Sequence, residues 1–379
     1  MIMKSARDES VKYDYWLFIF VVGLLIFGSI MVMSAGSFIA AEKFNNDNYF
    51  ITNQIKNASL AIVAFIVAML LNYKNYNNKL LMYIGMGITV LSLVYLLTSN
   101  NGDSIKGAKR WIFGFQPSEI AKNMIVFYLA FSLNKFRINL DKFIKGYVFH
   151  LAILVGIVTL VLFQPAFSTS MMIFTIGYSM LYLSGMKLKH LLSSMILIIP
   201  VIIIIALFKS YRTDRIKTFF DPSQDISGKG WQVEQSLLGF GNGGLMGSGL
   251  GESRQKEFYL PEPHNDFIFS IIGDEFGFIG AVLLVLAYIV IMSRGFIIAV
   301  RAPDYYGFLL ASGITLTIVI YSIFNMCITL GLVPPTGLPL PLVSYGGTSL
   351  IMTMFGLGVL LNISYKSKIY GTKNVEFKK

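Results

Sequence analysis

Long apolar runs, separated by short polar connections, follow one another along almost the whole chain. A helix needs about 20 apolar residues to cross the hydrocarbon core of a bilayer, and runs near this length recur ten times. The strands of a membrane barrel would instead be about ten residues long and alternate in polarity. The pattern therefore predicts an all-α protein with ten membrane-spanning helices, at residues 15–33, 57–71, 80–97, 117–133, 147–163, 168–183, 191–208, 267–293, 308–330 and 347–363.

The composition agrees with a protein that lies in a membrane. Hydrophobic residues make up 55% of the 379 positions and charged residues 13%, whereas soluble domains contain roughly 25% charged residues. The single cysteine, Cys327, falls inside a predicted span, which excludes both a disulfide framework and a cysteine zinc site. Because most connections are short, we expect one compact membrane domain over residues 1–379.

The net charge of +11 is distributed unevenly along the chain. An even number of spans puts both termini on one side, and that side would hold 18 of the 31 lysine and arginine residues. Positively charged connections face the cytoplasm, so the termini are predicted to be cytoplasmic. The basic excess is then a signal of membrane topology, and we expect no nucleic-acid partner.

One connection, residues 209–265, is much longer than the others and is predicted to lie outside the cytoplasm. A loop of this length usually has a function of its own. Within its glycine-rich stretch, Gly239 to Gly251, the segment Gly239-Phe-Gly-Asn-Gly-Gly244 matches the G-x-G-x-x-G pattern but lacks the strand and helix of a dinucleotide site. We therefore expect a flexible loop there, or a close approach of the backbone to lipid or sugar.

A second unusual connection, residues 333–346, contains four prolines and no charge. Proline cannot donate a backbone hydrogen bond, and irregular backbone at membrane depth is tolerated only inside the protein or along a cavity. This segment is therefore predicted to re-enter the protein. The chain has no visible internal repeat, which counts against transporter folds built from repeated halves.

Few charges fall inside the predicted spans, and such charges usually face a cavity or a partner. The acids are Glu119, Asp274 and Glu275, and the base is Lys122. Glu119 and Lys122 are three residues apart, so they share a helix face and can neutralise each other. This pair either lines a polar cavity or only fixes helix packing. For Asp274 and Glu275 we favour a structural role.

Asp266 lies where the long loop meets the eighth predicted span, after Pro261 and Pro263. The start of a helix favours an ionised carboxylate, so Asp266 is either an ordinary N-cap or a functional residue. His264 is the only histidine near it. A serine triad or a histidine-rich metal site is therefore not expected.

Several motifs in these regions resemble those of the SEDS family of peptidoglycan polymerases, which includes FtsW, RodA and SpoVE. The matching segments are Lys109-Arg-Trp-Ile112, Phe115-Gln-Pro-Ser-Glu119 with Lys122, Phe163-Gln-Pro165, Gln235-Ser-Leu-Leu238, residues 247–256, Tyr259-Leu-Pro-Glu262, His264-Asn-Asp-Phe-Ile-Phe269 and residues 339–347. They occur in the family's order over essentially the whole chain. Residues 254–259 are more similar to FtsW and SpoVE, whereas residues 337–341 are more similar to RodA, and we favour the FtsW side.

The resemblance implies ten helices, cytoplasmic termini, an outer long loop and a place in the bacterial cytoplasmic membrane. It implies polymerisation of lipid II, the undecaprenyl-diphosphate-linked disaccharide peptide, into glycan strands for cell division or shape. A class B penicillin-binding protein and other divisome or elongasome membrane proteins would be partners. The family's proposed catalytic aspartate falls on Asp266, and its polar cavity residues fall on Glu119 and Lys122.

The chemistry needs a general base and positive charge, because a sugar hydroxyl attacks a carbon that carries a diphosphate leaving group. Asp266 is the expected base. The expected diphosphate ligands are Lys109, Arg110, Lys122, Arg212 and Arg215, with a possible Mg²⁺ or Mn²⁺ ion. The matching motifs add Lys256, Glu257, His264 and Ser344 as residues expected to bind substrate.

Ala166 departs from the family, which usually has aspartate after the Gln-Pro pair. Alanine neither binds a cation nor accepts a proton, so either this lineage dispenses with the carboxylate or the chain is an altered form with reduced activity. Two alternatives to an enzyme remain open. One is a lipid II flippase, for which four intramembrane charges make a poor path. The other is a non-catalytic scaffold for a penicillin-binding protein.

Overall fold

Helices dominate the structure, a computed structural model that describes residues 13–98, 103–105, 108–112, 114–164, 166–207, 219, 229–258, 260 and 262–370. The α-helices are α1 (Tyr15–Phe44), α2 (Tyr49–Leu70), α3 (Lys79–Thr98), α4 (Pro117–Lys135), α5 (Phe149–Phe163), α6 (Phe167–Leu183), α7 (Leu188–Leu207), α9 (Lys229–Gly243), α10 (Gln255–Phe258), α11 (Ile268–Val300), α12 (Tyr305–Thr329) and α13 (Gly347–Tyr370). Shorter elements are 3-10 turns at Tyr73–Tyr76 and Arg137–Asn139, a π-helix at Phe143–Val148, and strands β1 (Asp103–Ile105) and β2 (Ala108–Trp111).

Seven of these helices are long and apolar enough to cross a membrane: Tyr15–Phe44, Tyr49–Leu70, Lys79–Thr98, Phe143–Phe163, Ile268–Val300, Tyr305–Thr329 and Gly347–Ser367. Phe167–Leu183 and Leu188–Ile202 are shorter apolar helices. α4 carries the buried Glu119 and Lys122. The chain is thus a multi-pass membrane protein.

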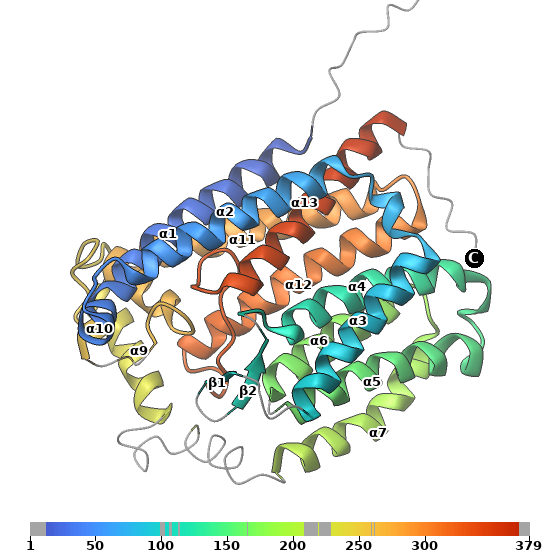
Figure 1. The fold of residues 1–379 in the computed structure, drawn as a ribbon, viewed down its shortest axis with the longest axis horizontal. Helices are drawn as coiled ribbons and strands as arrows, with labels where there is room; N and C mark the ends of the chain where they lie inside the picture. The colour runs from blue at the N-terminus through green and yellow to red at the C-terminus, as the bar shows by residue number, and fades with distance from the viewer. Residues whose placement is uncertain are drawn as a thin grey trace, which may run out of the picture.

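The bundle has two ends, and the described start of the chain lies at the same end as the C-terminal part of α13 (Figure 1). We call this the terminal end. Several contacts join its connections: Asp14 with Arg294, Asp14 N to Ser364 Oγ (3.2 Å), Tyr73 OH to Asp304 (2.7 Å), Tyr305 OH to Ser184 O (2.7 Å), and the Arg137 guanidinium 4.4 Å from the Tyr305 ring centre. The opposite end, which holds α9, α10 and the β-hairpin, we call the loop end.

Several helices extend beyond the predicted spans. α1 ends at Phe44 rather than at residue 33, and α13 ends at Tyr370 rather than at residue 363. Hydropathy detects only the apolar part of a helix, whereas Glu and Lys continue it readily in water. α1 stops where Asn45 adopts a left-handed conformation (φ 51°) and its N–H bonds back to Ala40 and Ala41.

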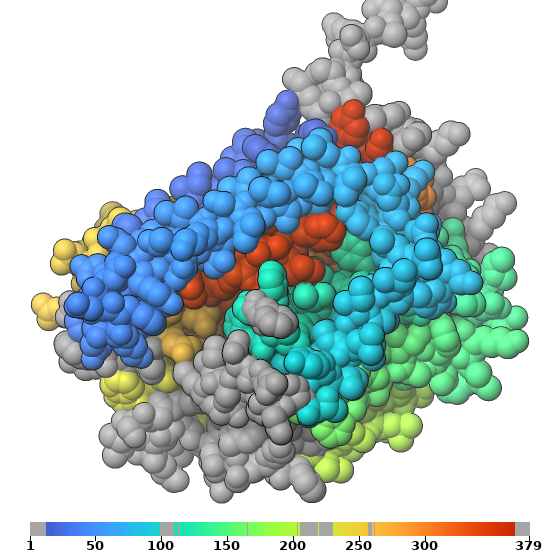
Figure 2. Space-filling view, viewed as in Figure 1, coloured from blue at the N-terminus to red at the C-terminus, as the bar shows by residue number. Residues whose placement is uncertain are grey.

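The connection before α4 contains an antiparallel hairpin of β1 and β2. An isolated bridge between Ile112 and Phe115 follows the hairpin and leads into α4 at Pro117. The space-filling view shows this face of the molecule, with α13 and the start of α4 visible between α2 and α3 (Figure 2).

The glycine-rich stretch packs against a break in α11. Gly277 has φ 65° and ψ −164°, which interrupts the helix. The loop replaces the lost helical bonds, since Phe278 N donates to Gly244 O (2.9 Å) and Ser248 N to the carbonyl oxygen of Asp274 (2.9 Å). A Cβ on Gly247 would lie 2.2 Å from a backbone oxygen of α11. The expectation of a flexible loop or an approach to lipid or sugar is wrong here, because the glycines allow contact with another backbone.

The proline-rich connection, residues 333–346, lies inside the protein, as predicted. Leu338, Leu340 and Val343 are at most 2% exposed, and the Tyr288 hydroxyl of α11 donates to Pro341 O. On α1, a Cβ at Gly28 would lie 2.5 Å from a backbone oxygen of this segment. The connection is therefore held between α1, α11 and α12.

Candidate functional site

The turn that precedes α11 is fixed by three consecutive backbone carbonyls, each accepting a hydrogen bond from a distant segment. The pairs are Tyr345 N to His264 O (2.9 Å), Ser344 Oγ to Asn265 O (2.6 Å) and Asn325 Nδ2 to Asp266 O (2.9 Å). Two donors come from the proline-rich connection and one from α12. The backbone at Asp266 is consequently held in place independently of its side chain.

Asn325 connects both of these elements. Its Nδ2 donates to Asp266 O and also to Leu338 O at 2.7 Å, and the side chain is fully buried. The sequence analysis missed Asn325. An amide inside an apolar run was the available signal, because polar groups in membrane helices commonly bond across helices.

The Asp266 side chain is partly exposed beside Gly337. Gly337 has φ 72°, and a Cβ there would lie 3.1 Å from Asp266 Oδ2, so the glycine leaves room for the carboxylate. The N-cap of α11 is Phe267, with no side-chain capping bond. The interpretation of Asp266 as an ordinary N-cap is therefore wrong, although its carboxylate still lies at the helix end that favours negative charge.

Glu119 and Lys122 form the ion pair that their spacing predicts. Lys122 Nζ lies 2.6 Å from Glu119 Oε2, both side chains are buried, and the ammonium lies 4.1 Å from the ring centre of Tyr321 on α12. Removing two charges from water is expensive, so a buried pair is weak evidence for stability alone. The pair joins α4 to α12.

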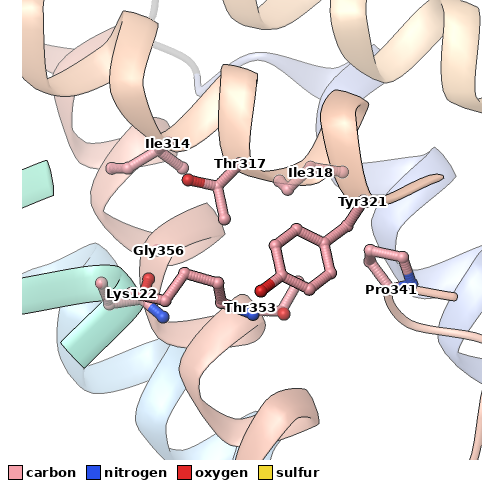
Figure 3. A pocket seen from close by; sticks show the side chains of 9 residues that line it. Lys122, Ile314, Thr317, Ile318, Tyr321, Pro341, Thr353 and Gly356 are labelled. Atoms are coloured by element: carbon pink, nitrogen blue, oxygen red, sulfur yellow. The ribbon is translucent and has the colours of Figure 1, made fainter. Parts of the chain in front are cut away.

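A small cavity opens beside this pair (Figure 3). Its lining is Lys122, Asn123, Ile314, Thr317, Ile318, Tyr321, Pro341, Thr353 and Gly356. Tyr321 projects between Lys122 and Pro341. The space holds about one water molecule, so it does not accommodate a sugar as it stands. Glu119 is not among its lining residues, whereas Lys122 is, so a polar cavity lined by the whole pair stays a prediction.

The cavity and the Asp266 turn share two structural supports. Pro341 lines the cavity, and the same connection supplies Ser344 and Tyr345 to the turn. On α12, Tyr321 and Asn325 are four residues apart, which puts them on one helix face. A shift of α12 or of the proline-rich connection would thus affect the ion pair and Asp266 together.

Two other residues expected to bind substrate are used within the fold. His264 is 7% exposed, and its ring centre lies 4.0 Å from the ring centre of Phe50 and 5.6 Å from that of Tyr345. The Ser344 hydroxyl accepts from Leu340 N (2.8 Å) and donates to Asn265 O. Both side chains contribute to the packing of the turn, and their expected role in substrate binding stays a prediction.

The other residues that were predicted to bind substrate are described in different degrees of detail by the structure. Arg110 is half-buried on β2, near the start of α4. The structure places the backbones of Lys109 on β2 and Glu257 on α10, whereas Arg212 and Arg215 lie outside the described residues. Lys256 is buried in an ion pair with Glu275.

No three His, Cys, Asp or Glu residues in the described part of the chain form a group that could hold a metal ion. A complete protein cage for Mg²⁺ or Mn²⁺ therefore does not fit these residues. Magnesium often binds through one or two carboxylates plus substrate phosphates, so the expected metal requirement stays a prediction.

Ala166 is the N-cap residue of α6 and is 6% exposed. Its side chain makes no capping hydrogen bond. An aspartate at this position would have backbone N–H groups of the first helical turn within reach, so the departure from the family removes both a charge and a cap.

A family model described as the FtsW/RodA/SpoVE cell cycle proteins matches residues 15–369. The chain belongs to this family. It is 37% identical to a probable peptidoglycan glycosyltransferase FtsW of Trichlorobacter lovleyi, over 94% of each chain. It is also 37% identical to the stage V sporulation protein E of Bacillus subtilis, over 94% of this chain and 98% of that protein.

Solved structures of the family share the fold. A chain from a peptidoglycan synthase complex, described as coordinating polymerization and crosslinking, aligns with a TM-score of 0.75 and 26% identity, over 93% of this chain and 97% of that one. The rod shape determining protein RodA of Thermus thermophilus aligns with a TM-score of 0.67 and 25% identity, over 93% and 96%. Family membership and the apolar helices identify a multi-pass protein of the bacterial inner membrane.

Proposed function

We propose that this chain is a peptidoglycan glycosyltransferase that polymerises lipid II into glycan strands at the outer face of the cytoplasmic membrane, for cell division or cell shape. The observation that carries the proposal is the turn at Asp266. Three hydrogen-bonded carbonyls fix its backbone, while the carboxylate stays partly exposed at the loop end. Relatives that match nearly the whole chain are named as peptidoglycan glycosyltransferases.

The proposed topology has ten spans, with the terminal end in the cytoplasm and the loop end outside. The bundle supports this arrangement because Lys74, Arg137 and Arg294 all take part in contacts at the terminal end, as positively charged cytoplasmic connections should. The charged α4 would be the least apolar span, tolerated because Glu119 and Lys122 neutralise each other inside the protein.

In the proposed reaction, a hydroxyl of the acceptor sugar attacks the anomeric carbon of the donor. Asp266 accepts the hydroxyl proton, a carbon–oxygen bond forms, and the bond from that carbon to the diphosphate oxygen breaks. The electron pair leaves with the polyprenyl diphosphate, which is already a good leaving group. A positioned general base typically contributes 10² to 10⁴-fold.

Positive charge at the loop end would stabilise the departing diphosphate. The proposed ligands are Arg110 and Lys109, which lie on β2 close in sequence to α4, together with Arg212 and Arg215. Lys122 is already paired with Glu119. Its proposed role is to keep the cavity polar and to support Tyr321 rather than to hold the diphosphate directly.

A class B penicillin-binding protein is the proposed partner, which would crosslink the strands that this chain polymerises. The fold shared with a chain of a peptidoglycan synthase complex supports this proposal. Other divisome or elongasome membrane proteins would bring the pair to its place of action.

Incubation of the purified protein and its partner with lipid II, followed by separation of the products on a gel, tests the proposal. Glycan polymer is the expected product. Movement of lipid II across liposomes without polymer would instead indicate a flippase. If the protein forms no polymer and moves no lipid II, it is a scaffold. A partner variant without transpeptidase activity serves as the control that polymerisation is measured separately from crosslinking.

A further inference from the structure

The buried Lys256 side chain lies in a polar cluster that joins the long loop to two helices. Its ammonium donates to Gly251 O, to Ser34 Oγ on α1 (3.4 Å) and to Glu275 Oε1 on α11 (3.3 Å). An ammonium has three protons, so these acceptors account for all of them. The side chains of Lys256 and Glu275 are 6% and 0% exposed.

The same carboxylate oxygen also receives a second donor. Ser34 Oγ lies 2.5 Å from Glu275 Oε1, so α1, α10 and α11 meet at one atom. Ion pairs at low exposure require good geometry and further hydrogen bonds to offset desolvation. The cluster provides both for the lysine, which leaves no donor of Lys256 free for a diphosphate.

Neighbouring contacts fix the rest of this part of the loop. Ser253 Oγ donates to Asp274 Oδ2 at 2.6 Å, and Gly249 N donates to Glu275 O at 3.0 Å. The loop therefore binds one carboxylate oxygen of Asp274 through Ser253 and one of Glu275 through Lys256, which fits the structural role that we favoured for both residues. The chain then turns, with Leu260 N bonded to Gln255 O (3.1 Å), and reaches Asp266 ten residues after Lys256.

We propose that Lys256 is a positioning residue, whose buried ion pair with Glu275 and hydrogen bond to Ser34 anchor the upstream arm of the loop that carries Asp266. Asn325, Ser344 and Tyr345 hold the turn from its other side. This inference rests on the proposed function. It replaces the expectation that Lys256 binds substrate, because a buried lysine with all its donors engaged within the fold acts through the loop.

Paired substitutions distinguish a lysine that positions the loop from a lysine that binds the diphosphate, because the two roles predict different activities for the double variant. Lys256→Met removes the ammonium and leaves Glu275 buried without a counter-charge, which loosens the loop. Glu275→Gln leaves the lysine unpaired in the same way. The double variant removes both charges, so a positioning pair predicts strong coupling between the two changes. A lysine that binds the diphosphate predicts that the double variant is at least as slow as Lys256→Met.

The experiment measures kcat and KM for lipid II polymerisation by the full chain with its partner. For Lys256→Met we expect kcat to fall by about tenfold or more with KM changed by less than about twofold, because substrate contacts are kept. The double variant should recover to within about threefold of the wild-type kcat. Ser34→Ala, a change without loss of charge, should give a smaller fall in kcat and provides a variant that folds.

Hydrogen exchange supplies a readout independent of turnover. Lys256→Met should speed exchange over residues 244–266, and the double variant should restore protection. Lys187→Met is the matched control, because its ion pair with Asp141 is exposed at 47% and 75%. It should change neither kcat nor exchange in this segment.

A raised KM with unchanged kcat in Lys256→Met, or a double variant no faster than the single one, would overturn the proposal. Wild-type kcat and wild-type hydrogen exchange in Lys256→Met, Glu275→Gln and the double variant would also overturn it. If the wild-type protein makes no polymer, the proposed function fails, whereas the exchange measurements still report whether Lys256 and Glu275 anchor the loop together.

Discussion

Asn325 offers the sharpest perturbation of the candidate site without touching its carboxylate. Asn325→Ala removes the donor from two carbonyl oxygens, those of Asp266 and Leu338. Leaving a buried acceptor unpaired costs about 1–3 kcal/mol, but bonds between membrane helices average about 0.6 kcal/mol. Since Asp266 is partly exposed and water can replace one bond, we expect a loss of stability of about 1–3 kcal/mol.

The effect on catalysis should be larger than the effect on folding. Released from Asn325, the Asp266 turn keeps only its two bonds to the proline-rich connection. A misplacement of about 1 Å at a reacting group can cost 10²-fold. We therefore expect kcat for polymerisation to fall about 100-fold, while thermal melting in detergent still shows a folded protein.

Thr329→Val is the matched control for Asn325→Ala. Thr329 is buried one turn further along α12, and its hydroxyl bonds within the helix, to Asn325 O (3.2 Å) and Met326 O (2.9 Å). Its kcat should stay within about twofold of wild type. If Asn325→Ala polymerises lipid II at the wild-type rate, the hydrogen bond from Asn325 to the Asp266 carbonyl does not position the Asp266 carboxylate. That result would refute the prediction.

Three further predictions concern other parts of the fold. Glu119→Gln leaves Lys122 without its counter-charge and should destabilise by about 3–5 kcal/mol, whereas adding Lys122→Met should recover part of the loss; melting temperatures of both variants decide this. Ala166→Asp supplies a cap to α6, so it should raise the stability of the protein by about 1 kcal/mol. If the missing carboxylate limits turnover, the same variant should also raise the polymerisation rate. An unchanged rate would mean that this chain works without a carboxylate at position 166. Gly247→Ala places a methyl group 2.2 Å from a backbone oxygen at φ 84° and should destabilise by more than about 1 kcal/mol, whereas Gly87→Ala, with nothing within 4 Å, should not; equal melting temperatures would contradict the packing account.

Helices were the part of the fold that the sequence predicted best. Each apolar run marks the centre of a helix, because twenty unbroken apolar residues have few alternatives in a bilayer. The i,i+3 spacing of Glu119 and Lys122 was enough to predict their ion pair, since helical geometry alone brings them together. The ends were less predictable, as α1 shows, because polar residues continue a helix into water beyond the apolar run that hydropathy detects.

The support of the candidate site was not predictable in the same way. Asn325 and Ser344 act through bonds to the main chain of a turn at least 59 residues away in sequence, and no local pattern encodes such a contact. The glycine-rich stretch was misinterpreted for a related reason. Its residues fit the break at Gly277 in α11, a partner that only the folded chain reveals. The burial of Lys256 beside Glu275, on which its proposed positioning role rests, is likewise visible only in the folded chain.

The central claim is that Asp266 acts as the general base in glycan polymerisation, and Asp266→Asn tests it most directly. Asparagine keeps the size of the side chain and the backbone bond to Asn325, but it cannot accept the proton. Measured with purified protein, its partner and lipid II, the rate should fall by about 10² to 10⁴-fold, with the melting temperature unchanged. Polymer formed at the wild-type rate by Asp266→Asn would contradict the account.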